Sequence, residues 1–368
     1  MHWAVTRSER SESRGLAVRI GRKAKSTARF LGSLRSLGMT MLKGSITMKK
    51  LICLTILALA CAAWGCGQTA TKTGPAPRAD RPLRFIFISP VCHEEFFDPV
   101  KKGMQDAARM MGVQAVFTGT EGVDVEAQAA MVTKAVQEGY DGIAVDIIDA
   151  AAFDDAVKAA LEKGVPVVAF NTDDTTPNVR LSSVNQNLYQ AGRVLGRNAA
   201  ESIPAGSQVL IAMHDEGISA LEDRFRGMTE ELKKKGITWK RVITGSDPVK
   251  GQQVVSKALK ENPDIKVVLG TGQADTEPAG LVLEKQFKGQ DYWAAGFDLS
   301  PAILRLIKVG VIRFTIDQQP YIQGFYPVIQ LTLFCRYGIR PSSIDAGAWV
   351  ITKEDVDRVM ELKKRNYR

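Results

Sequence analysis

The 368-residue chain carries 49 Lys and Arg against 40 Asp and Glu, a formal net charge of +9. Its first 50 residues hold 12 of the basic and 2 of the acidic residues, which leaves 37 basic against 38 acidic residues in the remainder, a net charge of −1. The body of the chain is therefore near neutral, and we expect no nucleic-acid partner. Its length suffices for two domains with cores of their own.

The first 47 residues are rich in Arg and Ser and poor in acidic residues, a composition also typical of transit peptides and basic tails. An export signal follows them, and nothing should precede such a signal. We therefore expect residues 1–47 to be a non-native or disordered extension that results from an over-extended start site.

Residues 48–66 have the pattern of a bacterial secretory signal peptide. Lys49 and Lys50 precede a largely apolar core over residues 51–63, which is shorter than the ~20 residues of a membrane-spanning helix. The segment ending in Cys66 resembles a lipoprotein signal, although Trp64 and Ala63 depart from the usual Leu-small-small-Cys pattern. We predict lipid attachment at Cys66 and a location in the periplasm or on the outer face of the cell membrane, with plain secretion as the alternative.

Residues 67–82 are rich in Gly, Thr, Ala and Pro and lack apolar periodicity, so we expect a tether. Three of the five cysteines lie in the signal region, and the other two, Cys92 and Cys335, form no CxxC pair. Neither a disulfide framework nor a zinc ribbon is indicated.

The stretch over residues 83–104 contains the first predicted strand and helix. An apolar run at residues 85–88 suits a buried parallel strand, and Asp98 followed by Pro99 predicts the start of a helix. The loop between them carries Glu94 and the aromatic pair Phe96 and Phe97, which local folding does not require. Loops at the carboxyl ends of parallel strands hold ligands in open α/β sheets.

Strand-like and helix-like segments alternate along the rest of the chain. Apolar runs predict strands over residues 85–88, 113–117, 142–145, 165–170, 209–213, 267–269, 293–297 and 311–316. Helical spacing predicts helices near residues 100–111, 125–136, 149–161 with Asp149 as the cap, 189–195, 221–232, 254–259, 281–287 and 322–334. This repeated βα winding predicts an α/β fold of two similar doubly wound parallel-sheet lobes, and a short strand and a charged tail close the chain.

Polar residues recur directly after the apolar strand runs. Asp146, Asn171, Asp298 and Gln318 each occupy such a position. Carboxylates and amides bind vicinal hydroxyls, and aromatic faces cover the C–H faces of a sugar ring, so these residue types together suit a neutral polyol. The alternative for any single position is a helix cap.

Five segments resemble, in the expected order, motifs of the periplasmic sugar-binding proteins of ABC importers, the ribose-binding type. They are the Phe96-Phe97 pair, GVPVVAFN ending at Asn171, SALEDRFRG with Arg224, GFDLSP with Asp298 and TIDQQP with Gln318. The resemblance covers residues 83 to about 351. It implies the type I periplasmic binding fold, with two lobes joined by a multi-strand hinge and a ligand cleft between them. We assign residues 83–185 and 319–347 to the first lobe and residues 186–318 and 348–362 to the second.

The resemblance also implies roles for individual side chains. Phe96 and Phe97 are expected to stack on the sugar, and its hydroxyls are expected to be bound by Asp146, Asn171, Arg224, Asp298 and Gln318. Gln273 and Asp275 lie, with a shifted match, where the family has an Asn-Asp pair.

Departures from the ribose binders at Glu94, Thr172 and Ser246 put ribose itself in doubt. We interpret Glu94 either as a reader of an extra hydroxyl or an amine, or as a solvated loop carboxylate.

Catalytic motifs are missing from the sequence. It contains no GxxxxGK[ST], HExxH or GxSxG pattern, and it has three histidines in all. We therefore predict no enzymatic activity, no cofactor and no metal.

We predict a monomeric receptor that captures a sugar or polyol by hinge closure and delivers it to the transmembrane subunits of an ABC permease. A sensory input to a chemoreceptor or histidine kinase stays open as an alternative. A LacI-like effector domain shares the fold but would require a helix-turn-helix where residues 48–66 form an export signal.

Overall fold

The protein is described here from a computed structural model that covers residues 81–149, 151–173 and 179–368. The predicted extension, the signal peptide, Cys66 and most of the tether lie outside the described residues.

The first sheet has six strands, all parallel, in the order β11-β5-β4-β3-β1-β2. Its strands are β1 (Arg84–Ser89), β2 (Gln114–Gly119), β3 (Gly142–Val145), β4 (Val167–Asn171), β5 (Ser182–Asn185) and β11 (Ile344–Asp345). Its helices are the 3-10 turn η2 (Glu95–Phe97), α3 (Asp98–Met111), α4 (Val125–Gln137), α5 (Asp154–Glu162) and α11 (Pro320–Tyr337).

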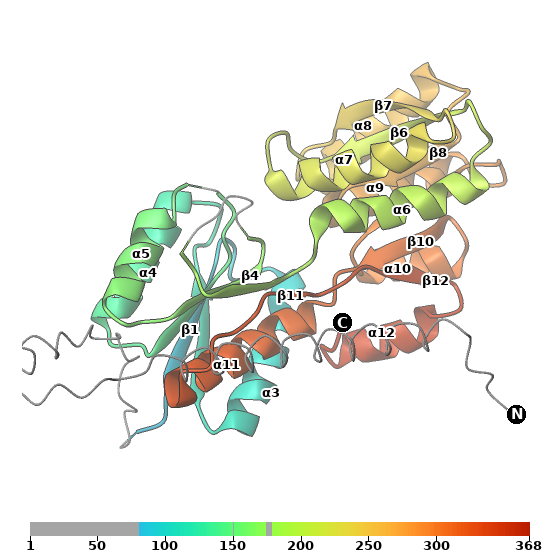
Figure 1. The fold of residues 1–368 in the computed structure, drawn as a ribbon. Helices are drawn as coiled ribbons and strands as arrows, with labels where there is room; N and C mark the ends of the chain where they lie inside the picture. Colours follow the sequence, from blue (N-terminus) through green and yellow to red (C-terminus); the bar gives the residue numbers. More distant parts are fainter. Residues whose placement is uncertain (1–80, 150, 174–178) are drawn as a thin grey trace, which may run out of the picture. The chain divides into compact units, whose positions relative to one another are not determined.

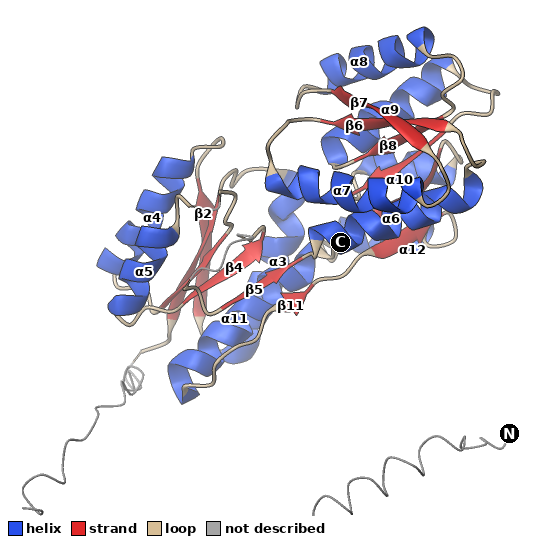
Figure 2. Cartoon of the chain, turned by 45° about the horizontal axis from the view of Figure 1, so that its top comes forward, coloured by secondary structure: helices blue, strands red, loops and turns tan. Residues whose placement is uncertain are grey.

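Both faces of the first sheet are buried, as the continuous apolar runs of its strands require. Phe85 and Phe87 pack with α3 and α11, whereas Ile86 and Ile88 pack with α4 and α5 on the opposite face. Figures 1 and 2 show these two helix pairs on either side of the strands. The alternation follows from the two-residue period of side chains along a strand.

Two glycines allow α3 and α11 to pack closely. A Cβ atom on Gly324 would lie 1.9 Å from the carbonyl oxygen of Val100, and one on Gly103 would lie 2.0 Å from that of Tyr321. The backbones therefore meet where no larger residue fits.

The second sheet also has six strands, in the order β12-β10-β9-β8-β6-β7, and only β12 runs antiparallel to its neighbour. Its strands are β6 (Gln208–Met213), β7 (Thr238–Ile243), β8 (Val267–Gly270), β9 (Trp293–Phe297), β10 (Ile312–Asp317) and β12 (Trp349–Thr352). Its helices are α6 (Leu188–Ser202), α7 (Ser219–Lys233), α8 (Pro248–Glu261), α9 (Gln273–Gln286), α10 (Pro301–Lys308) and α12 (Val356–Lys364).

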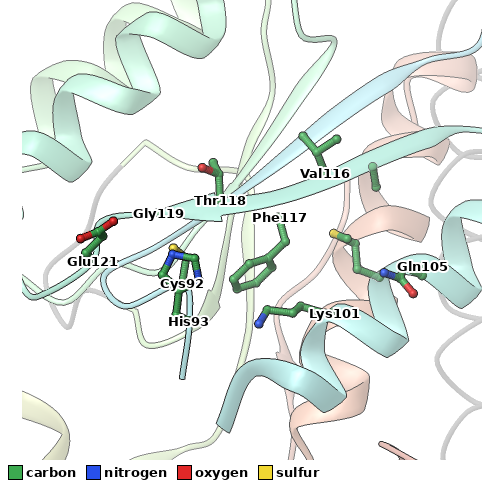
Figure 3. Close-up of a pocket in the computed structure, with 11 residues that line it drawn as sticks. Cys92, His93, Lys101, Gln105, Val116, Phe117, Thr118, Gly119 and Glu121 are labelled. Carbon is green, nitrogen blue, oxygen red and sulfur yellow. The ribbon is translucent and has the colours of Figure 1, made fainter. Parts of the chain in front are cut away.

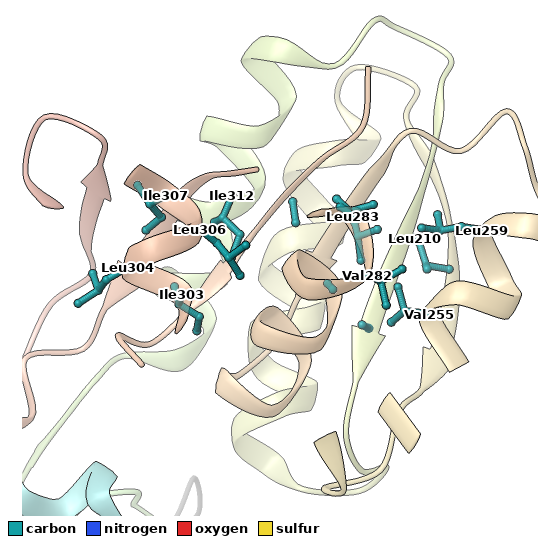
Figure 4. Packing of buried hydrophobic residues seen from close by; sticks show 14 of the residues in the cluster. Leu210, Val255, Leu259, Val282, Leu283, Ile303, Leu304, Leu306, Ile307 and Ile312 are labelled. Carbon is teal, nitrogen blue, oxygen red and sulfur yellow. The ribbon is translucent and has the colours of Figure 1, made fainter. Parts of the chain in front are cut away.

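This sheet too is covered on both faces. Ile211 and Leu269 pack against α6 and α7. Leu210 faces the other side, where it packs with residues of α8, α9 and α10 such as Val255, Leu283 and Ile307 (Figure 4). The two sheets are thus similar doubly wound units.

The chain passes between the sheets three times, after β5, after β10 and after β11. The crossing segments are hydrogen-bonded to one another. The Gln186 Nε2 donates to the Gly347 carbonyl at 2.9 Å, and the Gln319 Nε2 donates to the Ala346 carbonyl at 2.6 Å. Side-chain amides therefore link the three crossings.

One predicted helix start is wrong. Asp149 does not cap α5, which begins at Asp154 with Phe153 ahead of it. The Asp149 carboxylate instead accepts hydrogen bonds from the backbone amides of Ala151 and Ala152, both at 3.0 Å. The carboxylate thus closes a separate turn that precedes the helix.

Candidate functional site

Four predicted site residues lie at the carboxyl ends of parallel strands. Asp146 follows β3 and Asn171 ends β4 in the first sheet, while Asp298 follows β9 and Gln318 follows β10 in the second. This is the edge at which open α/β sheets bind ligands.

Two of these residues have a left-handed backbone. The φ angle is 60° at Asn171 and 71° at Asp298. Such angles are uncommon outside glycine, although Asn and Asp tolerate them, and they cluster at functional sites. A side chain is thus present at both positions where glycine would fit the backbone more easily.

Asp146 is the centre of the polar group in the first sheet. Its side chain is fully buried, and its carboxylate accepts from the Asn171 Nδ2 at 2.7 Å and from the Thr172 backbone amide at 3.1 Å. Burial raises the pKa of Asp146 to about 7, although these hydrogen bonds lower it in part. The carboxyl group therefore exchanges its proton near neutral pH.

Gln128 of α4 supports this group from below, and the sequence analysis missed it. The fully buried Gln128 donates its Nε2 to the Asp146 carbonyl oxygen at 2.8 Å. Its signal in the sequence was a polar residue on the apolar face of a predicted helix.

Asp298 joins three segments in the second sheet. Its Oδ1 accepts from the Gln318 Nε2 at 2.6 Å, and its Oδ2 accepts from the Gln273 backbone amide at 3.0 Å. Each carboxylate oxygen keeps a further lone pair that can accept from a hydroxyl.

Arg224 of α7 is buried beneath this group, 5% exposed. Its guanidinium donates to the Thr271 carbonyl at 3.0 Å and to the Gln186 Oε1 at 2.8 Å, and it lies 4.2 Å from the centre of the Phe297 ring. Its Nε–H has no partner among the described residues. Burial lowers the pKa of Arg224, while Asp298 and Asp275 oppose this effect.

Asp275 is fully buried and has three side-chain partners. Its carboxylate accepts from the Thr244 and Thr271 hydroxyls at 2.8 and 3.0 Å, and it lies 3.1 Å from the His214 Nδ1. The structure thus places Asp275 as a support for neighbouring side chains.

His214 follows β6 at the same edge of the sheet, and the sequence analysis assigned it no role. Burial lowers the pKa of His214, but the hydrogen bond to Asp275 and the charges of Asp275, Asp298 and Asp215 outweigh this and raise it.

The aromatic pair is divided between core and surface. Phe97 is 2% exposed and packs in the core with Phe117, whereas Phe96 is half-buried and meets Phe97 edge-on at 5.0 Å. Glu94 is exposed.

A small hollow brings four of the predicted residues together. It is lined by Phe96, Gln273, Asp298 and Gln318, together with Lys363 and Arg368. Asp146, Asn171 and Arg224 belong to the polar groups described above but do not line this hollow.

A larger hollow of about 630 Å³ lies beside the edge strand β2 (Figure 3). Cys92, His93, Lys101 and Glu121 are among its lining residues, and none of the predicted site residues is.

The part of the chain that the structure describes contains no cluster of His, Cys, Asp and Glu side chains arranged to hold a metal ion. Among the same residues, no helix is both long and apolar enough to cross a bilayer.

Two doubly wound sheets, three crossings and polar side chains at the carboxyl edges define a two-lobed solute-binding protein. Residues 85–333 match the periplasmic binding protein domain. The chain belongs to the periplasmic binding protein family, whose members bind solutes outside the cytoplasm.

Two relatives carry names that state a ligand. The xylose/arabinose-binding protein XylF of Sulfolobus acidocaldarius is 30% identical over 289 residues, which span 74% of this chain and 72% of that protein. The ribose import binding protein RbsB of Bacillus subtilis is 26% identical over 229 residues, 62% of this chain and 74% of that protein.

Solved structures of sugar-binding proteins have the same fold. A carbohydrate transporter of Acidothermus cellulolyticus in complex with myo-inositol superposes with a TM-score of 0.69 at 26% identity, covering 78% of this chain and 100% of that one. The glucose-galactose binding protein GanP of Geobacillus stearothermophilus gives a TM-score of 0.69 at 25% identity, over 75% of this chain and 99% of that one.

Proposed function

We propose that the protein captures a neutral sugar or polyol by hinge closure and passes it unchanged to an ABC permease. The observation that carries this proposal is the polar group around Asp298. Its carboxylate is oriented by Gln318 and Gln273, while the buried Arg224 beneath it has an unused N–H. These groups offer acceptors and a donor to vicinal hydroxyls.

The ligand class has two further supports. Phe96 supplies a half-buried aromatic ring in the same hollow, and such a ring covers the C–H face of a sugar. The named relatives and structural neighbours bind xylose, arabinose, ribose, glucose, galactose or myo-inositol. Glu94, which differs from the ribose binders, is the residue that we expect to discriminate between sugars.

Closure requires ligand contacts from both sheets. We infer that Asp146 and Asn171 of the first sheet complete the set made by Arg224, Asp298 and Gln318 of the second. The crossing segments near Asn185 and Gln318 would absorb the rotation.

The same proposal includes the location and state of the protein. We propose that it is a monomer in the periplasm or on the outer face of the cell membrane, where a lipid on Cys66 holds it. It converts no substrate.

The test begins with mass spectrometry of ligand released from the purified protein. A thermal-shift screen of pentoses, hexoses and inositols follows, with calorimetry on each hit. We expect micromolar binding, about −8 kcal/mol, for at least one sugar. A shift with amino acids or nucleosides and with no sugar contradicts the ligand class.

Asp298→Ala tests the site. It removes charged hydrogen bonds, each worth about 1.5–3 kcal/mol, so affinity should fall at least about tenfold. The exposed Asp291→Ala in the same sheet unit is the matched control and should bind as the wild type does. Unchanged affinity in Asp298→Ala refutes the site.

A further inference from the structure

The segment after α12, residues 363–368, lies against the candidate site. Two of its cations, Lys363 and Arg368, line the hollow that contains Phe96, Asp298 and Gln318. The side chains of Lys363 and Arg368 are only 17% and 18% exposed. This segment carries none of the predicted sugar-binding residues.

Arg368 is bonded to the crossing that holds Gln318. Its guanidinium donates to the Asp317 Oδ2 at 2.7 Å and to the Gln319 Oε1 at 3.3 Å. The other Asp317 oxygen accepts from the Gln319 backbone amide at 2.8 Å. Arg368 thus contacts the residues on both sides of Gln318.

This arrangement fixes a strained turn. Gln319 has a φ of 53°, a left-handed conformation that is costly for a side-chain-bearing residue. Asp317 is 1% exposed, so its carboxylate depends on its partners for compensation of its charge. Within the turn, Gln318 directs its Nε2 to the Asp298 Oδ1 at 2.6 Å.

The same segment also reaches elements of the first sheet. The Lys363 ammonium lies 3.4 Å from the Glu95 carboxylate, next to Phe96. The Tyr367 ring lies 5.2 Å from the ring of Tyr321 on α11, and the Lys102 ammonium of α3 lies 4.9 Å from the centre of the Tyr367 ring. The segment is therefore held at several points.

We propose that Arg368 is a positioning residue of the solute site and acts through Asp317 on Gln318. The salt bridge holds the turn over residues 317–319 in the conformation that presents the Gln318 amide and, through it, the Asp298 carboxylate. Sugar affinity then depends on a residue that need not touch the sugar. This inference rests on the proposed function, because it assumes that Gln318 and Asp298 bind the sugar.

The experiment is a double-mutant cycle on sugar affinity, measured by calorimetry with the sugar that gives the largest thermal shift. Arg368→Gln should weaken binding about tenfold, the equivalent of one charged hydrogen bond. Gln318→Ala should weaken it at least as much. The double variant should bind no more weakly than Gln318→Ala, because both changes remove the same positioned amide. A merely structural role of Arg368 would instead give losses that multiply.

Matched variants separate the possible failures. Arg358→Gln alters an exposed arginine of α12 and should bind as the wild type does. Arg368→Lys keeps a cation beside Asp317 and should fold with about a threefold loss of affinity, since it restores the charge with a single point of attachment. Wild-type affinity in both Arg368 variants, or losses that multiply in the cycle, overturns the proposal. Unchanged affinity in Gln318→Ala and Asp298→Ala instead refutes the proposed sugar site.

Discussion

Replacing Asp146 by Asn should make the stability of the protein less dependent on pH. The carboxyl group of Asp146 has a pKa of about 7 in the folded protein, because it is fully buried, against about 3.9 in an unfolded chain. Between these values the folded state binds the additional proton. The free energy of unfolding therefore falls as the pH rises through this window and levels off above pH 7.

The size of the effect follows from the difference of about three pKa units, which corresponds to about 4 kcal/mol. Asn cannot ionise, and its oxygen can still accept from the Thr172 amide. The Asn171 amide can turn to present its oxygen to the new NH₂ group. The variant should thus gain up to about 4 kcal/mol on the wild type between pH 4.5 and pH 8.

Thermal unfolding followed by circular dichroism at pH 4.5, 6 and 8 measures this gain. At roughly 2 °C per kcal/mol, the melting temperature of the variant should rise by up to about 8 °C relative to that of the wild type. The exposed Asp155→Asn in the same sheet unit is the control and should differ from the wild type by the same small amount at each pH. A constant difference for Asp146→Asn would refute the reasoning, because the buried carboxyl group would then be ionised throughout.

Three other predictions concern the aromatic pair, a helix contact and a histidine. Phe97→Ala should cost about 3–5 kcal/mol of stability because Phe97 is in the core, whereas Phe96→Ala should leave the melting temperature nearly unchanged and weaken sugar binding by roughly three- to tenfold; equal effects on melting would contradict the assignment. Gly324→Ala should cost about 1–3 kcal/mol because its new methyl group meets the Val100 carbonyl, while Gly122→Ala, which meets nothing within 4 Å, should be near neutral in the same melts. His214→Gln should be least stable relative to the wild type below pH 6.5, because the raised pKa of His214 means that its stabilising charge is lost as the pH rises through that value; a difference that is the same at pH 5.5 and pH 8 would exclude this charge effect.

The strands that the sequence predicted correctly are those with continuous apolar runs. The prediction over residues 293–297 coincides with β9, because both faces of that strand are buried and every side chain is apolar or small. β7 escaped prediction because it is an edge strand whose sequence TWKRVI is largely exposed. β5, with the sequence SSVN, escaped because its buried serines hydrogen-bond to neighbours instead of forming an apolar run.

The positions of the candidate site residues were predicted better than their surroundings. Asp298 and Gln318 follow strands, so the rule that polar residues at strand ends converge was enough to pair them. Phe96 and Phe97 are adjacent in sequence, and only the packing of Phe97 on Phe117 shows that one ring belongs to the core. The contact of Arg368 with Asp317 joins residues 51 positions apart and depends on the path of the chain after α12, which local patterns do not encode.

The three crossings also affect when the protein can fold during synthesis. The core around Phe85 and Phe87 includes Val328 and Leu331 of α11, which follow β1 by roughly 240 residues. At about 5–20 residues per second, a ribosome needs on the order of 10–50 s to supply that cover. Until then one face of β1 stays unburied, and the growing chain should remain an open substrate for a secretion channel that accepts only unfolded polypeptide. The late arrival of α11 thus delays folding until after the time at which an exported protein must leave the cytoplasm.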